Sequence, residues 1–312
     1  MCDTAEVRFR PQPWQLILLI AAICCLSVGG MVWYHSGTLT LPALLKRMPS
    51  GNALVIWIDF AGLRRTGFLQ LLAGAKASED LEYQRFVRST RFDYMHDLDG
   101  ALAAFPRDGG AYFLVQGRFD WMGLRTYVGE QSGQCVNSLC RVAGSGPERR
   151  ISFMPLRRDL MAMAVGPDAY AVEGLAAAHS GPNPPAPEGL VWLTFPGSLP
   201  RSAWNLPDGV SPFARIVENA PKVTLAFVPE GDRLAARLEI LCRTEKEAAD
   251  VATQLTSTTQ LLRNMIEREN QKPNPADFSG VLTAGAFHSE GARALGNWPI
   301  ERAFVQNLLG TQ

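Results

Sequence analysis

The sequence predicts an α+β protein with one N-terminal transmembrane helix followed by two tandem α+β units with mostly antiparallel sheets. Three observations support this. Residues 14–34 are almost entirely apolar, β-rich runs joined by tight turns follow them, and amphipathic helical stretches separate those runs. The order strand, helix, hairpin, helix, hairpin, helix occurs twice, with an extra strand the first time, although no residue-level repeat accompanies it.

Composition and turn signals divide the chain into six parts. They are a cytoplasmic tail (1–13), a transmembrane signal anchor (14–34), a connector (35–50), a first unit (51–179), a proline-rich linker (180–189) and a second unit (190–312).

The stretch 14–34 has the length and composition of a membrane helix. Between Arg10 and Lys46 there is no acid, lysine or arginine, and about 20 apolar residues cross the ~30 Å hydrocarbon core. Aromatic residues near both ends suit the headgroup interfaces. A cleaved signal peptide is the main alternative, but the apolar run exceeds the usual 7–15 residues and no A-x-A site follows. A buried core helix is a third interpretation.

Basic residues indicate the orientation. Arg8 and Arg10 lie close to the apolar stretch, whereas Lys46 and Arg47 are about a dozen positions beyond it. The positive-inside rule therefore predicts a cytoplasmic tail and a periplasmic or otherwise extracytoplasmic body. We expect a single-pass protein of the inner (cytoplasmic) membrane, with the lipid bilayer as partner of residues 14–34.

Overall charge argues against a nucleic-acid partner. The chain has 30 basic and 30 acidic residues and no formal net charge, so no global field attracts polyanions. Its arginine pairs are short and carry no interleaved aromatic residues, which is typical of a solvated surface.

Six cysteines suggest one disulfide. Cys135 and Cys140 lie in QCVNSLC, where Asn137 and Ser138 favour a turn that brings the two side chains across a hairpin. In an oxidising compartment this favours a disulfide, which would contribute ~2 kcal/mol for so short a loop. Unpaired thiols or a metal site are the alternatives, but the chain has neither CxxC pairs nor neighbouring histidines there. Cys242 closes an alternating strand pattern and is predicted to be buried.

The first unit opens with an apolar strand at 53–60, after which two helical stretches, a hairpin around PRDGG and a helix capped by Asp120 follow. The later elements are the cysteine hairpin, two strands and a helix opened by Pro167. Helices are predicted over 63–72, 81–90, 119–128 and 166–178, and strands over 98–105, 111–116, 150–155 and 160–165.

The second unit is predicted to contain the same kinds of element, with one long helix among them. Thr244 and Glu247 form a capping box that begins a helix over 244–269, with Ala248, Val251 and Leu255 on one face. A final helix is predicted to begin at Pro299. The other predicted elements are strands at 190–195, 222–228, 234–242, 281–287 and 292–295 and a short helix at 213–219.

One polar cluster offers candidate chemistry. Asp93, His96, Asp97 and Asp99 lie within the segment FDYMHDLDG. They would suit a metal loop or a hydrolase, but Met95 and Pro106 occupy positions where a calcium EF-hand needs its first and last carboxylates. The simpler interpretation is a polar turn in which aspartates cap backbone groups.

Motifs for catalysis or cofactor binding are missing. The sequence has no G-x-S-x-G elbow, no GxGxxG turn and no GxxxxGK[ST] loop. We therefore predict no catalytic residue, no cofactor-binding residue, no metal ligand and no cofactor.

Several segments resemble uncharacterised membrane-anchored bacterial proteins of unknown function. The similarity includes the N-terminal anchor, ALVIWIDF, EYQRFVRSTRFDYMHDLD, YFLVQGRFD and GNWPIERAF. It implies a bacterial envelope protein and transfers no catalytic residue. We expect an anchored binding or scaffolding domain without catalysis, acting on an unknown protein or envelope partner. The alternatives are an anchored hydrolase that uses the polar cluster and a subunit of a larger membrane complex.

Overall fold

The structure is a computed structural model that describes residues 39–73, 81–107, 109–144, 146, 148–177, 181–199, 211–269 and 271–310. The predicted tail and transmembrane segment lie outside these residues. Within the described ranges, no helix combines the length and the apolar character needed to cross a bilayer. Contacts divide the chain into Met1–Leu41 and Pro42–Gln312, and the fold below is that of the second part.

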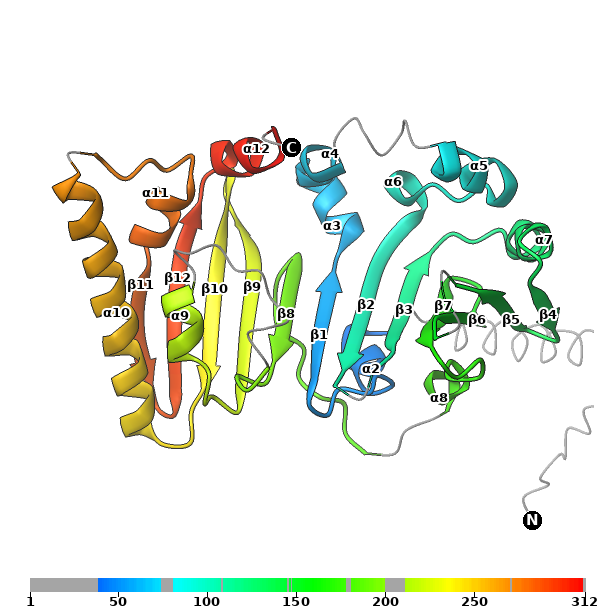
Figure 1. Ribbon diagram of the computed structural model, residues 1–312, viewed down its shortest axis with the longest axis horizontal. Helices are drawn as coiled ribbons and strands as arrows, with labels where there is room; N and C mark the ends of the chain where they lie inside the picture. Colours follow the sequence, from blue (N-terminus) through cyan, green and yellow to red (C-terminus); the bar gives the residue numbers. More distant parts are fainter. Residues whose placement is uncertain are drawn as a thin grey trace, which may run out of the picture. The chain divides into compact units, whose positions relative to one another are not determined.

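The fold is α+β, with antiparallel strands throughout its sheet (Figure 1). Twelve strands of the described chain form one sheet in the order β11-β12-β10-β9-β8-β1-β2-β3-β7-β6-β5-β4. The strands are β1 (Ala53–Ile58), β2 (Leu98–Pro106), β3 (Ala111–Gly117), β4 (Gln134–Val136), β5 (Leu139–Ala143), β6 (Arg150–Arg157), β7 (Leu160–Gly166), β8 (Val191–Phe195), β9 (Lys222–Glu230), β10 (Arg233–Leu241), β11 (Ala286–Glu290) and β12 (Arg293–Ile300).

Helices connect the strands at the edges and over the faces of the sheet. The described helices are α2 (Leu41–Leu45), α3 (Phe60–Arg65), α4 (Phe68–Ala73), α5 (Leu81–Thr90), α6 (Tyr94–Asp97), α7 (Trp121–Glu130), α8 (Glu173–Ala176), α9 (Ser211–Ile216), α10 (Glu245–Arg268), α11 (Phe278–Thr283) and α12 (Arg302–Gly310).

The two predicted units contribute strands to a single continuous sheet. β1 pairs with β8 in register, with Ile58 opposite Val191 and Trp57 opposite Trp192. On each side of this pair five strands follow the same order, β1-β2-β3-β7-β6 on one side and β8-β9-β10-β12-β11 on the other, and the first side continues with the β5-β4 hairpin. The linker residues 181–189 have no helix or strand and lead from α8 into β8.

One face of the second half of the sheet is apolar, whereas the other face is mixed. In β10, Ala236 and Ile240 are buried on the apolar face, and the opposite face carries the exposed Arg237 and Glu239 beside the buried Ala235. Because successive side chains point to opposite faces, the mixed face is covered at Ala235 and open to solvent at Arg237 and Glu239.

Side-chain caps begin several helices at the predicted positions. Asp120 accepts hydrogen bonds from the Met122 and Gly123 N–H groups at 3.1 Å and begins α7. Thr244 Oγ1 accepts from the Glu247 N–H at 3.1 Å and begins α10. The Glu247 carboxylate closes the box on the Arg243 N–H, at 2.9 Å, one residue before the position that a standard capping box would use.

The helix predicted over residues 63–72 is wrong in its extent, because two helices occupy this region. α3 begins at Phe60, where the Asp59 carboxylate caps the Gly62 N–H at 2.7 Å. Gly67 then adopts φ +74°, a left-handed conformation that ends α3 before α4 begins at Phe68.

The helix predicted over 166–178 is also too long. β7 continues to Gly166, and the Asp168 carboxylate then accepts from the Tyr170 N–H at 2.9 Å. This local turn competes with helix formation, so that only the short helix α8 forms, at Glu173–Ala176.

Near the C-terminus, the predicted strand at 281–287 and the predicted helix start at Pro299 are wrong. Asp277 caps the Ser279 and Gly280 N–H groups and begins α11, which occupies most of that strand range. Pro299 lies inside β12, opposite Ala235 of β10 and beyond the end of β11. A proline is tolerated there because one side of the strand has no ladder partner, and the last helix begins at Arg302.

Candidate functional site

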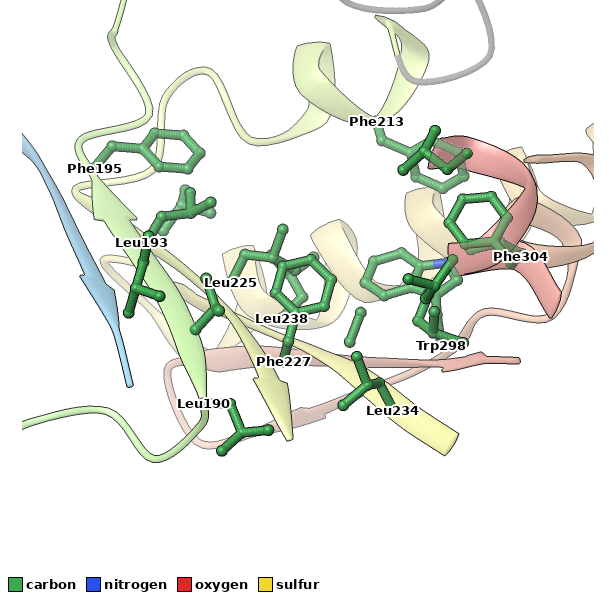
Figure 2. Close-up of a pocket in the computed structure, with 18 of the residues that line it drawn as sticks. Leu190, Leu193, Phe195, Phe213, Leu225, Phe227, Leu234, Leu238, Trp298 and Phe304 are labelled. Atoms are coloured by element: carbon green, nitrogen blue, oxygen red, sulfur yellow. The ribbon is translucent and has the colours of Figure 1, made fainter. Parts of the chain in front are cut away.

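A large cavity lies between the apolar face of the second half of the sheet and the helices that cover it (Figure 2). Its volume is about 910 Å³. Aliphatic and aromatic side chains dominate its described lining, and they come from β1, β8, β9, β10, β12, α3, α4, α6, α9, α10, α11 and α12. Such a volume is at the upper end for small-molecule sites, which range from about 300 to 1,000 Å³.

Strand register builds the sheet wall of the cavity. Leu193 of β8 lies opposite Leu225 of β9, which in turn lies opposite Leu238 of β10. Val191 lies opposite Phe227 in the same way. Because side chains alternate with period two, these residues all project from one face, and Figure 2 shows several of them directed toward the helices.

The helix wall closes the cavity from the other side. Phe213 of α9, Phe68 of α4 and Phe304 of α12 line it, and each is at most 9% exposed. Phe213 also makes an edge-to-face contact with Trp298 of β12, with ring centroids 6.3 Å apart. Leu255 is the residue that the long helix α10 contributes to the described lining. The helix packs mainly on β11 and β12.

The cavity reaches the surface beside α11 and α12. Phe278 and Leu308 both line it, yet they are 41% and 46% exposed. Phe278 packs edge-to-face on Phe304, with ring centroids 5.1 Å apart, and Asn307 Nδ2 donates to the Ala276 carbonyl at 3.1 Å. These contacts hold α11 and α12 together at the mouth.

The described lining of the cavity is almost entirely apolar. Glu218 and Tyr94 are the ionisable side chains among the described lining residues, and Tyr94 packs on Tyr83 with ring centroids 5.4 Å apart. No histidine, cysteine or serine belongs to the described lining. The cavity therefore provides apolar contact area without a described nucleophile and base pair.

The predicted polar cluster lies around α6, where Asp93 acts as a cap. Its Oδ1 accepts from the Met95 N–H at 2.9 Å and from the Tyr83 hydroxyl at 2.8 Å. Its Oδ2 lies 2.7 Å from His96 Nδ1. Burial raises the pKa of Asp93, but the hydrogen bonds with His96, Tyr83 and Met95 outweigh this and hold it below its usual value. Burial, followed by the bond to Asp93, raises the pKa of Tyr83.

The other two aspartates of the cluster have different partners. Asp97 accepts from the Asp93 N–H at 2.9 Å and pairs with Arg118 at 3.0 Å. Asp99 lies 3.6 Å from Arg64. The four side chains therefore act as caps and surface ion pairs, and the described residues contain no group of three or more acids, histidines and cysteines arranged to hold a metal ion.

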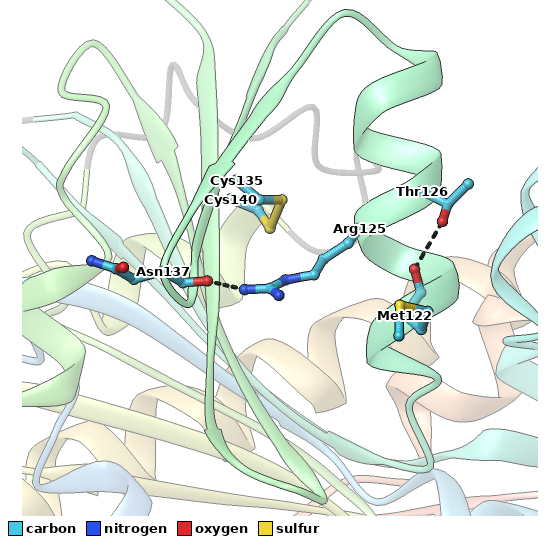
Figure 3. Close-up of a disulfide and its surroundings, with 6 residues drawn as sticks. All are labelled: Met122, Arg125, Thr126, Cys135, Asn137 and Cys140. Atoms are coloured by element: carbon cyan, nitrogen blue, oxygen red, sulfur yellow. Dashed lines mark hydrogen bonds between the residues drawn. A yellow bond between two sulfur atoms is a disulfide. The ribbon is translucent and has the colours of Figure 1, made fainter.

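Cys135 and Cys140 are joined by a disulfide in the β4–β5 hairpin (Figure 3). Each is the direct cross-strand neighbour of the other. Arg125 of α7 donates to the Asn137 carbonyl in the turn, which connects the hairpin to the helix. Cys242 is buried with a free thiol, and burial, followed by the charge of Glu247, raises its pKa, so that the thiol is kept protonated.

Sequence reasoning did not find the cavity. Its residues are leucines, phenylalanines and valines in alternating or helical patterns, which also predict an ordinary packed core. The distinguishing property is the space between elements that are far apart in the chain, for example Leu63, Leu225 and Phe304. No local pattern in the sequence encodes that spacing.

The chain matches no protein-family model and no curated protein sequence. Among solved structures it is similar to crystal forms I, III and IV of TP0453, with sequence identities of 11%, 9% and 11% and TM-scores of 0.48, 0.48 and 0.44. These alignments cover 88%, 86% and 86% of this chain and 99%, 98% and 95% of the TP0453 chains.

Proposed function

We propose that this chain is a single-pass membrane-anchored protein whose extracytoplasmic domain binds an apolar ligand and carries out no catalysis. The observation that carries the proposal is the cavity of about 910 Å³ with its largely aliphatic and aromatic described lining. A packed interior leaves few spaces larger than a water molecule. A largely apolar space of this size that opens to the surface has the properties of a ligand-binding site.

The size of the cavity suits a hydrocarbon chain. One water occupies about 30 Å³ of the liquid, so the cavity has room for roughly thirty groups of that size. Each methylene removed from water contributes about 0.8 kcal/mol. A chain of about a dozen methylenes thus gains roughly 10 kcal/mol before the cost of immobilising the ligand is subtracted.

The proposed anchor gives this ligand a source. Residues 14–34 have the composition of a membrane helix, and a domain tethered by such a helix remains next to the acyl chains of the bilayer. The repeated strand connectivity supports the further proposal that two tandem α+β units built the sheet. The hydrolase alternative gains no support, because Asp93 and His96 pair with each other while Asp97 and Asp99 pair with Arg118 and Arg64, and none of the four belongs to the described lining of the cavity.

Photo-crosslinking tests the binding proposal with the full chain in its native membrane. The probe is an uncharged long-chain alcohol carrying an alkyl diazirine, and labelled peptides are identified by mass spectrometry. We expect labelling of cavity residues such as Leu225 and Phe304. Labelling confined to residues 1–38, with none in the cavity, would contradict the proposal.

A matched pair of variants makes this experiment specific. Leu225→Trp fills space inside the cavity, whereas Leu241→Trp adds the same atoms to an exposed position on the neighbouring strand, where Leu241 is 40% exposed. We expect Leu225→Trp to reduce labelling of the cavity at least tenfold and Leu241→Trp to leave it unchanged. Equal effects of both variants would count against the cavity as the binding site.

Localisation has its own test. A reporter that is active only in the periplasm, fused after Gln312, measures the side of the membrane that holds the body. Activity in a bacterial host is expected from the charge bias of Arg8 and Arg10. A silent but well-expressed fusion would reverse the orientation.

A further inference from the structure

We infer that the ligand is an anionic amphiphile, with its hydrocarbon chain in the cavity and its acidic head beside Arg302. The inference rests on the proposed function, because it presupposes that the cavity holds a ligand. It adds the class of head group and the side chain that recognises it.

Arg302 lies against the wall of the cavity. Its guanidinium carbon is 5.4 Å from the centre of the Phe68 ring, and Phe68 is 3% exposed and lines the cavity. The charged group therefore packs on an aromatic side chain of the wall while Arg302 itself remains exposed. An amphiphile has an apolar chain and a charged head. The apolar wall at Phe68 can contact the chain, and the solvated guanidinium of Arg302 can contact the head.

Arg302 is not itself part of the described lining, but it lies one helical turn from a residue that is. Arg302 is the first residue of α12, and Val305, three residues later, lines the cavity and is 7% exposed. Residues three apart are neighbours on a helix surface. A head group held by Arg302 would therefore lie next to the apolar wall formed by Val305 and Phe68.

Arg302 differs from other arginines in this part of the fold in its charge partners. Other arginines in this part of the fold have partners: Arg65 lies 3.8 Å from Asp59, and Arg233 lies 3.5 Å from Glu301. Among the described residues, no carboxylate forms an ion pair with Arg302. A guanidinium in this state can bind a carboxylate or phosphate with two parallel hydrogen bonds.

The acid at the cavity lies on another element. Glu218 follows α9 in the chain and belongs to the described lining. Glu218 therefore lies on the α9 side of the cavity, whereas Arg302 lies on the side of α4 and α12.

The test compares two diazirine probes in the full chain in native membranes, palmitic acid and its uncharged alcohol. Labelling of the cavity is divided by labelling of residues 1–38, which corrects for partition into the bilayer. We expect the wild-type chain to prefer the acid about tenfold, the effect of roughly one charge-assisted hydrogen bond. Unlabelled hexadecyl phosphate would compete if the site also accepts a phosphate head, whereas a lack of competition would restrict the head to a carboxylate.

Arg302→Gln should abolish the preference for the acid while labelling by the alcohol remains, which shows that the variant is folded. Arg237→Gln removes an exposed arginine from the opposite face of the sheet and should change nothing. If Arg302→Gln retains the preference, the head-group inference is wrong and the cavity still binds chains. If neither probe labels the cavity of the wild-type chain, the proposed function itself is wrong.

Discussion

The two halves of the sheet have the same strand connectivity but differ in how their helices cover it. In the first half, Leu124 and Val128 of α7 pack directly on Cys140 and Phe153 of the sheet. In the second half, α10 packs on the edge strand β11 and its neighbour β12, and the cavity lies over β8, β9 and β10. The first half retains a smaller pocket of about 190 Å³ beside Leu124, Cys140 and Phe153, against about 910 Å³ in the second half. The comparison indicates that the docking position of the helices, and not the strand order, sets how much space remains.

Truncation of one leucine in each half should show the largest difference between them. Leu114 of β3 is fully buried, so Leu114→Ala is expected to cost about 3 kcal/mol of unfolding free energy through lost contacts and a new void. Leu193 of β8 already borders open space, so Leu193→Ala should cost about 1 kcal/mol or less. Urea unfolding of the full chain in one detergent measures both values. Similar losses would mean that the second half is packed as tightly as the first.

Removal of the disulfide should have an intermediate effect that is confined to the first half. The pair closes a loop with a sequence separation of 5, for which chain entropy predicts a loss of about 2 kcal/mol in the double variant Cys135→Ser/Cys140→Ser. Hydrogen exchange should increase in β4 and β5 and remain unchanged in β9 and β10. Faster exchange around the cavity would show that the halves are coupled more strongly than their separate helix layers indicate.

The smallest expected effect concerns the charge of Asp93. Its folded-state pKa lies below its usual value, so its contribution to stability is present above the unfolded pKa of about 3.9 and is lost as the pH falls through the folded value. Asp93→Asn should therefore destabilise the chain at pH 7 by less than about 1 kcal/mol. The difference from the wild-type chain should disappear in strong acid. Thermal unfolding at several pH values measures this, and a difference independent of pH would assign the effect to the lost geometry of the cap.

Local chemistry made some elements predictable. Thr244 and Asp120 begin their helices as expected, because a side-chain oxygen and the N–H groups that it caps are close in sequence. The α+β class and the antiparallel sheet follow from alternation and turn residues in the same way. Pro299 and α11 were mispredicted because neighbouring strands and the Asp277 cap decide their conformation.

The candidate site could not be predicted because its essential property is distance between elements. Leu193 and Leu225 have the strand pattern of core residues, and Leu255 has the helix pattern of a core residue. Whether such side chains touch each other or face a cavity depends on how far the helix layer stands from the sheet. Arg302 is equally ordinary in the sequence and gains its significance from its contact with Phe68.

The pairing of β1 with β8 has a consequence for the nascent chain. The first half can assemble around β1 and β2 as soon as they are synthesised, but the second neighbour of β1 is made much later. Until then ALVIWI, the sequence of β1, remains an unpaired apolar edge, which is the kind of segment that recruits strands from other chains. The order of synthesis thus leaves an apolar edge of β1 open until β8 is made, and we expect truncation before β8 to yield insoluble chains.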